Sequence, residues 1–335
     1  MNRQIMVVKD LRTYYKTRLN EHVCAVDSVS LQLKEREIMG IAGESGCGKS
    51  TLALSLMGYY FPPLNFKSGS IKIDDVDIMK LEYEDLRKQV LGKKIAYIPQ
   101  AAMNALNPTK KIIRFIEDIM KEHHPELSKE QVYNMACKRF ESLNLPKRVL
   151  TSFPNELSGG MKQRTVIAIS TILNPKILIA DEPTSALDVT SQKIVIKMLK
   201  DLLDRGFVRS IIFITHELPL LRHIADVILI MYAGEIVESG KSNDVIFDPI
   251  HPYSKALMGS IIVPEEDMKN RELMDIPGAP PNLVHTQIGC RFSDRCKFVK
   301  SECRKQNIED KVHYDRVFKC IFDFKILKEL QMGDE

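Results

Sequence analysis

The segment GESGCGKS, Gly43–Ser50, constrains the fold of this chain more than any other stretch. It matches G-x-x-x-x-G-K-[ST] at every fixed position, and the apolar segment EIMGIAG leads into it. In such a loop the glycines let backbone N–H groups face a phosphate, the lysine adds a positive charge for the β- and γ-phosphates, and the hydroxyl binds Mg²⁺. A helix from about Lys49 to Gly58 would direct its positive end to the same place. The sequence therefore predicts a nucleotide-phosphate site in a strand–loop–helix unit.

The order of apolar segments along the chain predicts an α/β fold. KILIAD and SIIFIT read as buried strands joined by the helical segment SQKIVIKMLKDLLDRG, and this order implies a parallel sheet with crossover helices. VVKDLRTYY, AVDSVSLQL, GSIKIDDVDI and KKIAYIPQ read as further strands, and YAGEIVESG as a hairpin. Between about residues 101 and 173 the pattern becomes helical, with RFIEDIMKEHH and KEQVYNMACKRFESL as its clearest helices. IPGAPPNLV reads as a stiff loop.

The composition of the chain says more about its cellular compartment than about its function. The 335 residues carry a net charge of +4, which is too small to argue by itself for nucleic acid or lipid as a partner. The longest apolar runs, SIIFIT and DVILIMY, are far shorter than the roughly 20 residues that span a bilayer. No charged and then apolar leader follows Met1. We therefore expect a cytoplasmic protein, which could attach to a membrane only through a partner.

Two adjacent carboxylates end the buried segment KILIAD. Asp181 and Glu182 would lie at the C-terminal edge of the parallel sheet, where ligands of α/β proteins bind. Asp181 can hold Mg²⁺ through water, and Glu182 can polarise an attacking water. Charge pairs at strand ends are common, so this pair alone is only moderate evidence for a catalytic site. The motifs elsewhere in the chain strengthen that interpretation.

The segment NELSGGMKQR, residues 155–164, decides the family. Together with the phosphate loop and the two carboxylates, it resembles the ATP-binding subunits of ABC transporters over about Val7–Gly240. Further matching segments follow the family's order and spacing: Gln100 (Q-loop), LSGGMKQ at 157–163 (signature), SALD at 185–188 (D-loop) and His216 in FITHEL. The resemblance implies a P-loop NTPase fold with a parallel-sheet core, an antiparallel β subdomain and a helical subdomain at about 101–173. It places the nucleotide-binding domain at 1–245 and a small C-terminal extension at 246–335.

The resemblance also assigns the residues of the ATP site. Tyr15, rather than Tyr14, is assigned to stack on adenine, because strand alternation lets only one of them face the ligand. Glu182 would act on the attacking water, and His216 would hold the γ-phosphate and orient Glu182. Mg²⁺ would be held by Ser50, Gln100 and Asp181. The residues expected to contact ATP are Tyr15, Gly43, Ser45, Gly46, Cys47, Gly48, Lys49, Ser50, Thr51 and Gln100, with Cys47 a small filler of the loop.

The signature predicts a second anion site. Gly159 and Gly160 at a helix start expose N–H groups, and Ser158 adds a hydroxyl. One chain cannot enclose one ATP with both sites. In the family two subunits pair head to tail, so the resemblance implies that ATP lies between the phosphate loop of one subunit and the signature of the other, with Asp188 acting across the interface. Closing this site excludes water, and hydrolysis reopens the dimer. Every catalytic motif is intact, so we expect hydrolysis.

The chain beyond Gly240 resembles the C-terminal extension of oligopeptide/dipeptide importer ATPases. HPY at 251–253 and the segment IPGAPPNL match it, as does a cysteine series with the spacing C-x5-C-x6-C-x16-C. In several such importers these cysteines bind a [4Fe–4S] cluster, although four thiolates also suit Zn²⁺. Zinc ribbons normally use C-x2-C pairs, so the looser spacing favours the cluster; reduced packing cysteines are the third alternative. The four residues are Cys290, Cys296, Cys303 and Cys320.

These features together predict the ATP-hydrolysing subunit of an ABC importer that takes up oligopeptides or dipeptides. An oligosaccharide importer of the same family is the alternative substrate class. A soluble ABC ATPase of nucleic-acid repair or translation belongs to a different class and typically carries two cassettes, a long coiled coil or inserted zinc modules, and the sequence shows none of these. A tail-centred redox or nucleic-acid module that uses ATP as a switch is a third reading.

The expected partners follow from the same resemblance. They are a second ATPase subunit, for which a paralogue is favoured over a second copy, two membrane permease subunits and, indirectly, an extracytoplasmic substrate-binding protein. Nucleic acid is not expected. The subunit would lie on the cytoplasmic face of the cell membrane.

Overall fold

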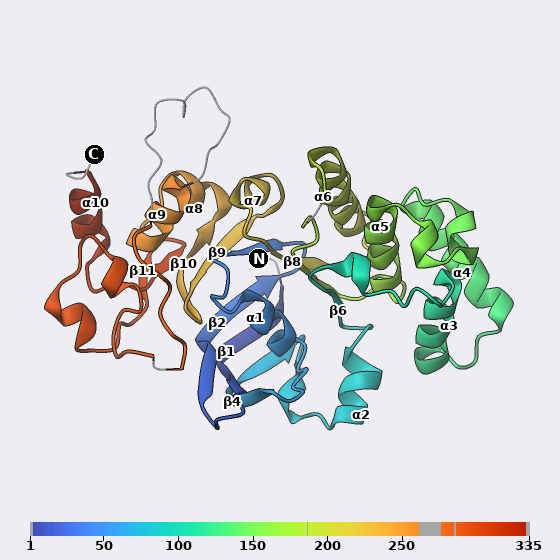
Figure 1. Cartoon of the computed structure of the whole chain (residues 1–335), viewed down its shortest axis with the longest axis horizontal. Coiled ribbons are helices and arrows are strands. Elements are labelled where there is room, and N and C mark those ends of the chain that lie inside the picture. Colours follow the sequence, from blue (N-terminus) through green and yellow to red (C-terminus); the bar gives the residue numbers. More distant parts are fainter. Residues whose placement is uncertain (1–2, 186, 261–275, 285, 333–335) are drawn as a thin grey trace. The chain divides into compact units, whose positions relative to one another are not determined.

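The computed structural model describes residues 3–185, 187–260, 276–284 and 286–332 (Figure 1). The chain divides into two compact units. We call Met1–Arg3 with Asp77–Ile212 the helical unit, and Gln4–Val76 with Phe213–Glu335 the phosphate-loop unit. Strand β8 (Ser210–Ile214) carries the chain from the first to the second. Within the described ranges, no helix is long and apolar enough to cross a membrane.

The N-terminal strands of the phosphate-loop unit form an antiparallel sheet, as the resemblance implies. In the C-terminal part of β2, Val29, Leu31 and Leu33 are buried, whereas Ser30 and Gln32 are exposed. This alternation confirms the period of two predicted from the sequence. β1 pairs antiparallel with both β2 and β4. The strands are β1 (Gln4–Lys16), β2 (His22–Lys34), β4 (Leu64–Ile73) and the short β5 (Val76–Asp77), which ends beyond this unit.

A second sheet of this unit carries the phosphate loop. β3 (Ile38–Ala42), buried along its whole length, pairs in parallel with β9 (Val227–Tyr232). β9 and β10 (Glu235–Lys241) form the predicted hairpin. β10 then pairs with a C-terminal strand, so the extension continues this sheet. The remaining strands are β12 (Arg316–Phe318) and β11 (Lys311–His313), which pair antiparallel.

Short helices contact the strands of this unit. Figure 1 shows α7, α8 and α9 beside β9 and β10, and these helices contact β3, β9 or β10. Residues 245 and 246, where we predict a domain boundary, lie inside α8. The helices are α1 (Lys49–Leu56), α7 (Leu218–Ile224), α8 (Ser242–Phe247), α9 (Pro252–Gly259) and α10 (Phe324–Met332).

The helical unit joins a short parallel pair of strands to a group of helices. β6 (Ile95–Ile98) pairs in parallel with β7 (Ile177–Asp181), which agrees with the parallel sheet predicted from the order of the segments. α3 packs on α4, and α5 contacts both α4 and β6 (Figure 1). On α3 the buried residues Ile112, Ile116 and Met120 recur every fourth position and lie on one face. The helices are α2 (Tyr83–Asp85), α3 (Ile112–His123), α4 (Lys129–Ser142), α5 (Gly159–Ser170) and α6 (Val189–Asp204).

Candidate nucleotide-binding site

The phosphate loop connects β3 to α1, and its backbone requires glycine. Gly48 has a φ of 107°, and a Cβ there would lie 2.0 Å from the carbonyl oxygen of Ala25. A Cβ on Gly43 would lie 2.1 Å from the carbonyl oxygen of Met231. No side chain of the described part of the chain caps α1 at its N-terminus. The N–H groups of the first helical turn are therefore left for an anion.

Lys49 and Cys47 lie within this loop. The Lys49 ammonium group donates to the carbonyl oxygens of Gly43, at 2.8 Å, and Glu44, at 2.9 Å, so the side chain folds back over the loop. Cys47 is buried, and its burial raises the pKa of the thiol. The protonated form is favoured, which supports the interpretation of Cys47 as a filler.

The two neighbouring tyrosines of β1 have different surroundings. The Tyr15 hydroxyl lies 3.2 Å from the hydroxyl of Thr51, in the first turn of α1. The Tyr14 ring instead packs against His22, with 4.3 Å between ring centroids. This arrangement puts Tyr15 beside the helix that follows the phosphate loop, which is what adenine stacking by Tyr15 requires.

His216 follows β8 and belongs to the same unit as the phosphate loop. The preceding residue, Thr215, donates its N–H to the carbonyl oxygen of Ile41 at 3.2 Å, and its hydroxyl accepts the N–H of Glu217 at 2.9 Å. His216 itself is exposed. The backbone thus fixes the position of His216 along β3, the strand that leads into the phosphate loop.

The carboxylate pair and the Q-loop glutamine meet in the helical unit. Asp181 ends β7 fully buried and accepts a hydrogen bond from the Tyr97 hydroxyl at 3.0 Å. Glu182 has a left-handed backbone with a φ of 47°, which turns the chain directly after the strand. Its carboxylate accepts a hydrogen bond from the side-chain amide of Gln100 at 2.9 Å. The structure therefore brings Gln100 and Glu182 together, although they lie 82 positions apart in the sequence.

The signature segment begins α5 in the expected way. Ser158 is the N-cap, and its hydroxyl accepts the N–H of Met161 at 3.4 Å. Gly159 and Gly160 form the first helical positions. Further along α5, the side-chain amide of Gln163 donates to the carbonyl oxygen of Pro183 at 2.6 Å, which ties the signature helix to the residue after Glu182.

The D-loop leads directly into α6. Asp188 caps this helix and accepts the N–H and the hydroxyl of Ser191, at 3.0 and 2.7 Å. These hydrogen bonds, the backbone one first, lower the pKa of Asp188. The start of α5 lies next to it, because a Cβ on Gly160 would sit 3.6 Å from the Ser191 hydroxyl oxygen. Ala186 of the D-loop lies outside the described residues.

Sequence reasoning missed several contacts of these sites. Glu44 in the phosphate loop binds Arg295 through its carboxylate and Tyr253 through its backbone N–H. Tyr97, which donates to Asp181, was likewise not predicted. A phenol within the otherwise apolar strand β6 is the one local signal for Tyr97. No local signal exists for Arg295, since 251 positions separate it from Glu44.

The four C-terminal cysteines lie within one region of the phosphate-loop unit. Burial, with the neighbouring sulfurs as a smaller cause, raises the pKa of Cys290 to about 12 and that of Cys296 to about 11. Each of the four sulfurs has a backbone N–H as a hydrogen-bond donor. The donors belong to Phe292, Phe298, Lys300 and Phe322. Among the described residues, no three His, Cys, Asp or Glu side chains are arranged to hold a metal ion.

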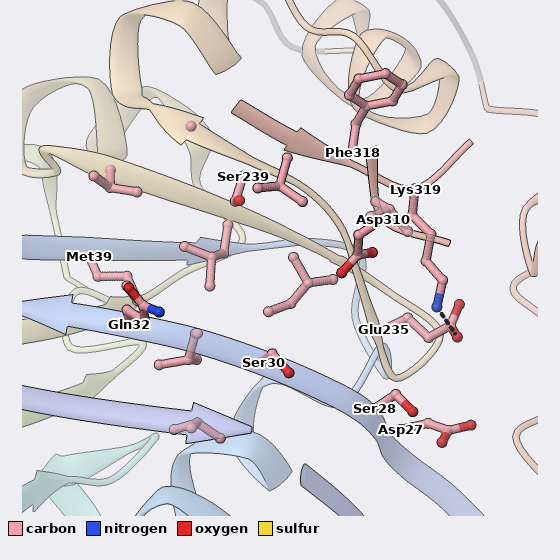
Figure 2. Close-up of a pocket in the computed structure, with 18 of the residues that line it drawn as sticks. Asp27, Ser28, Ser30, Gln32, Met39, Glu235, Ser239, Asp310, Phe318 and Lys319 are labelled. Atoms are coloured by element: carbon pink, nitrogen blue, oxygen red, sulfur yellow. Dashed lines mark hydrogen bonds and ion pairs between the residues drawn. The ribbon is translucent and has the colours of Figure 1, made fainter. Parts of the chain in front are cut away.

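A groove of the phosphate-loop unit is separate from the predicted ATP residues. It has a volume of about 1600 Å³, and none of those residues lines it. Figure 2 shows Ser28 and Ser30 of β2 on one side and Asp310 and Lys319 of the extension on the other. Lys319 bonds to Glu235 at 2.6 Å. Acidic and basic side chains both line the groove in similar numbers, so its charge favours no class of ligand.

Comparison with known proteins adds the family context. The model of the ABC transporter family matches residues 26–185, and that of the oligopeptide/dipeptide transporter C-terminal region matches residues 237–303. The chain is 37% identical to a dipeptide transport ATP-binding protein of Caldanaerobacter subterraneus, over 90% of this chain and 91% of the relative. It is 39% identical to an oligopeptide transport ATP-binding protein of Bacillus subtilis, over 88% and 82% of the two chains.

A solved structure supports the same architecture. It is a dimeric ATP-binding cassette in a post-hydrolysis state with ADP and Pi, superimposed with a TM-score of 0.62 and 28% sequence identity. The match covers 71% of this chain and 98% of the cassette. Fold and family thus agree with the expectation from the motifs.

Proposed function

The chain belongs to the ABC transporter family, as an ATP-binding subunit of the oligopeptide/dipeptide type, and on this premise we propose that its ATP hydrolysis drives peptide import through a membrane permease. The observation that carries the proposal is the combination of two features in one chain. An intact phosphate loop, Gly43–Ser50, is followed by a C-terminal region of the oligopeptide/dipeptide kind at residues 237–303. A relative matched over nine-tenths of this chain is named for dipeptide transport.

We infer the roles of the catalytic residues from their chemistry. Lys49 and the N–H groups of the loop bind the phosphates, and Tyr15 stacks on adenine. Glu182 polarises the attacking water, while Gln100 keeps its carboxylate in place through the 2.9 Å hydrogen bond. His216 holds the γ-phosphate.

The proposed Mg²⁺ ligands carry oxygen, the donor that this ion prefers. They are the Ser50 hydroxyl, the Asp181 carboxylate and the Gln100 side chain, and the Tyr97 hydrogen bond to Asp181 at 3.0 Å supports this assignment by orienting that carboxylate. When bound, Mg²⁺ neutralises charge on the phosphates.

We propose that the active form is a head-to-tail dimer. Ser158, Gly159, Gly160 and Asp188 of one subunit complete the ATP site of the other. The glycines at the start of the signature helix support this, since the N–H groups of Gly159 and Gly160 in its first turn can serve as a second set of donors. We further propose a paralogous partner ATPase, two permease subunits at the cytoplasmic face of the membrane and an extracytoplasmic binding protein. Residues 1–245 form the nucleotide-binding domain in this proposal, and 246–335 the extension.

Peptides are the proposed cargo rather than oligosaccharides. The relatives from Caldanaerobacter subterraneus and Bacillus subtilis are named for dipeptide and oligopeptide transport. Their similarity over most of both chains also disfavours a soluble ATPase of repair or translation.

Replacing Lys49 with Ala tests this function. Without the ammonium group the phosphates lose their point charge, so uptake of a labelled tripeptide falls to the background of cells that lack the chain. Lys72→Ala, an exposed lysine of β4, is the matched control and keeps full uptake. Uptake of a labelled trisaccharide, measured in parallel, stays at background in all strains. Lys49-dependent trisaccharide uptake would replace the peptide assignment with the oligosaccharide one.

We also propose that the four C-terminal cysteines hold a [4Fe–4S] cluster. Four thiols in one region, each beside a backbone N–H that can stabilise thiolate charge, support this proposal by their chemistry, although the described side chains are not arranged around a metal ion. The cluster would tie the segments around these cysteines together.

Metal analysis of protein purified without oxygen decides between the three alternatives. We expect about four irons and four sulfides per chain and absorbance near roughly 400 nm, all lost in Cys290→Ser. Cys137→Ser, which changes a buried cysteine of α4, keeps the metal content. Zinc alone would make the site a zinc site, and absence of iron and zinc would leave four packing cysteines.

A further inference from the structure

The C-terminal extension contacts the phosphate loop directly through Glu44. The two terminal nitrogens of Arg295 donate to the two carboxylate oxygens of Glu44, at 2.7 and 2.9 Å. The backbone N–H of Glu44 donates to the Tyr253 hydroxyl at 2.9 Å. Glu44 is thus held at its side chain and at its backbone by residues more than 200 positions away. The phosphate loop is braced by the extension.

Arg295 is a fixed anchor for this contact. Its Nε donates to the carbonyl oxygen of Pro277 at 2.8 Å, and one terminal nitrogen also bonds to the Tyr232 hydroxyl at 3.2 Å. The side chain is only 5% exposed. A forked pair with a buried arginine fixes geometry far better than a mobile ion pair on the surface.

Glu44 is also connected to the groups that receive phosphate. Its carbonyl oxygen accepts hydrogen bonds from the Lys49 ammonium group at 2.9 Å and from the Cys47 N–H at 3.3 Å. Its carboxylate is the one acidic group in the loop Gly43–Ser50. The loop binds an anion, so an unpaired carboxylate within it would weaken the binding of a triphosphate through repulsion between like charges. Arg295 neutralises this charge and holds the loop.

We propose that Arg295 is a positioning residue for ATP binding, which acts through Glu44. The C-terminal extension then contributes to ATP binding by holding the phosphate loop in its binding conformation. The inference rests on the ATPase function proposed above and adds a residue that none of the ABC motifs contains.

Steady-state ATP hydrolysis by the full-length chain tests the inference. Arg295→Met raises the KM for ATP about tenfold, because the less well-ordered loop binds ATP more weakly. It leaves kcat within about twofold of the wild type, because the residues that act in hydrolysis are unchanged. Adding Glu44→Gln to this variant removes the stranded carboxylate and returns KM to within about threefold of the wild type. Arg304→Met is the matched control, because Arg304 lies nine positions after Arg295 in the extension and pairs with the exposed Asp294. We expect this substitution to leave KM unchanged.

The outcomes separate this inference from the proposed function. An unchanged KM in Arg295→Met, or no recovery on adding Glu44→Gln, would show that Arg295 serves only the fold of the extension. Arg295→Lys keeps the charge without the fork and raises KM about threefold, so an unchanged KM in that variant decides the matter if the methionine variant does not fold. A wild-type chain that hydrolyses no ATP would instead overturn the function itself.

Discussion

Replacing Glu182 with Gln lowers kcat for ATP hydrolysis by about a thousandfold, within the 10²–10⁴-fold range of a general base. The amide retains a similar shape and can still accept the hydrogen bond of Gln100, but it cannot accept a proton from water. Because Lys49 and the loop are unaltered, ATP binding persists. ATP then accumulates unhydrolysed and holds the dimer closed.

Two measurements check this result. Turnover is followed by phosphate release, and the ATP-trapped dimer by size-exclusion chromatography with ATP and Mg²⁺. Glu141→Gln is the matched control, since Glu141 lies at the exposed end of α4 and pairs with Lys147. It should hydrolyse ATP normally. Normal turnover in Glu182→Gln would remove Glu182 from the role of base.

Replacing Ser158 with Arg stops hydrolysis while the isolated subunit still binds ATP. The change removes the signature hydroxyl and puts a large cation on the N-terminal turn of α5, so the second set of donors cannot close over a nucleotide. We expect at least about a hundredfold loss of turnover, of the size seen when one preorganised donor to the reacting group is lost. Equilibrium binding of a fluorescent ATP analogue to the monomer changes by less than about twofold.

A matched substitution separates this effect from a loss of helix capping. Removal of an N-cap costs about 1 kcal/mol of stability wherever it occurs. Ser128 caps α4 with a full capping box, so Ser128→Arg carries the same cost at a helix without a nucleotide motif. It should lower thermal stability as Ser158→Arg does, yet keep turnover. A parallel loss of monomer ATP affinity in Ser158→Arg would contradict a site completed by the partner.

The fold could be predicted wherever the signal was local. The alternation of Val29, Leu31 and Leu33 sufficed for β2, because burial of one face is set by a period of two. The predicted helix after the phosphate loop reached Gly58, whereas α1 ends at Leu56. Gly58 has a φ of 69° and lies just past the helix, a position that glycine favours. Gly58, which the sequence analysis placed at the end of the helix, therefore lies outside the helix and terminates it.

The site could be predicted only where residues lie inside motifs. The roles of Lys49, Glu182 and Ser158 could be predicted because each residue lies in a short motif that is recognisable from its neighbours in the sequence. The Glu44–Arg295 pair has no such signal, because it depends on how the extension packs after the chain has folded. Tyr97 is intermediate, since its strand is recognisable but its hydrogen bond to Asp181 is not.

The division of the chain into two units has a consequence for the order of its synthesis. The helical unit draws almost all its residues from one continuous stretch, Asp77–Ile212, whereas the phosphate-loop unit needs both ends of the chain. A ribosome adds about 5–20 residues per second, so on the order of ten seconds separates the emergence of the helical unit from that of the last strands. Early in this interval the loop that is to hold ATP has neither Tyr253 nor Arg295 to brace it. Tyr253 emerges first, and Arg295 follows shortly before the last strands. The nascent chain therefore acquires a finished phosphate loop only near the end of translation, and premature termination before Arg295 removes this brace.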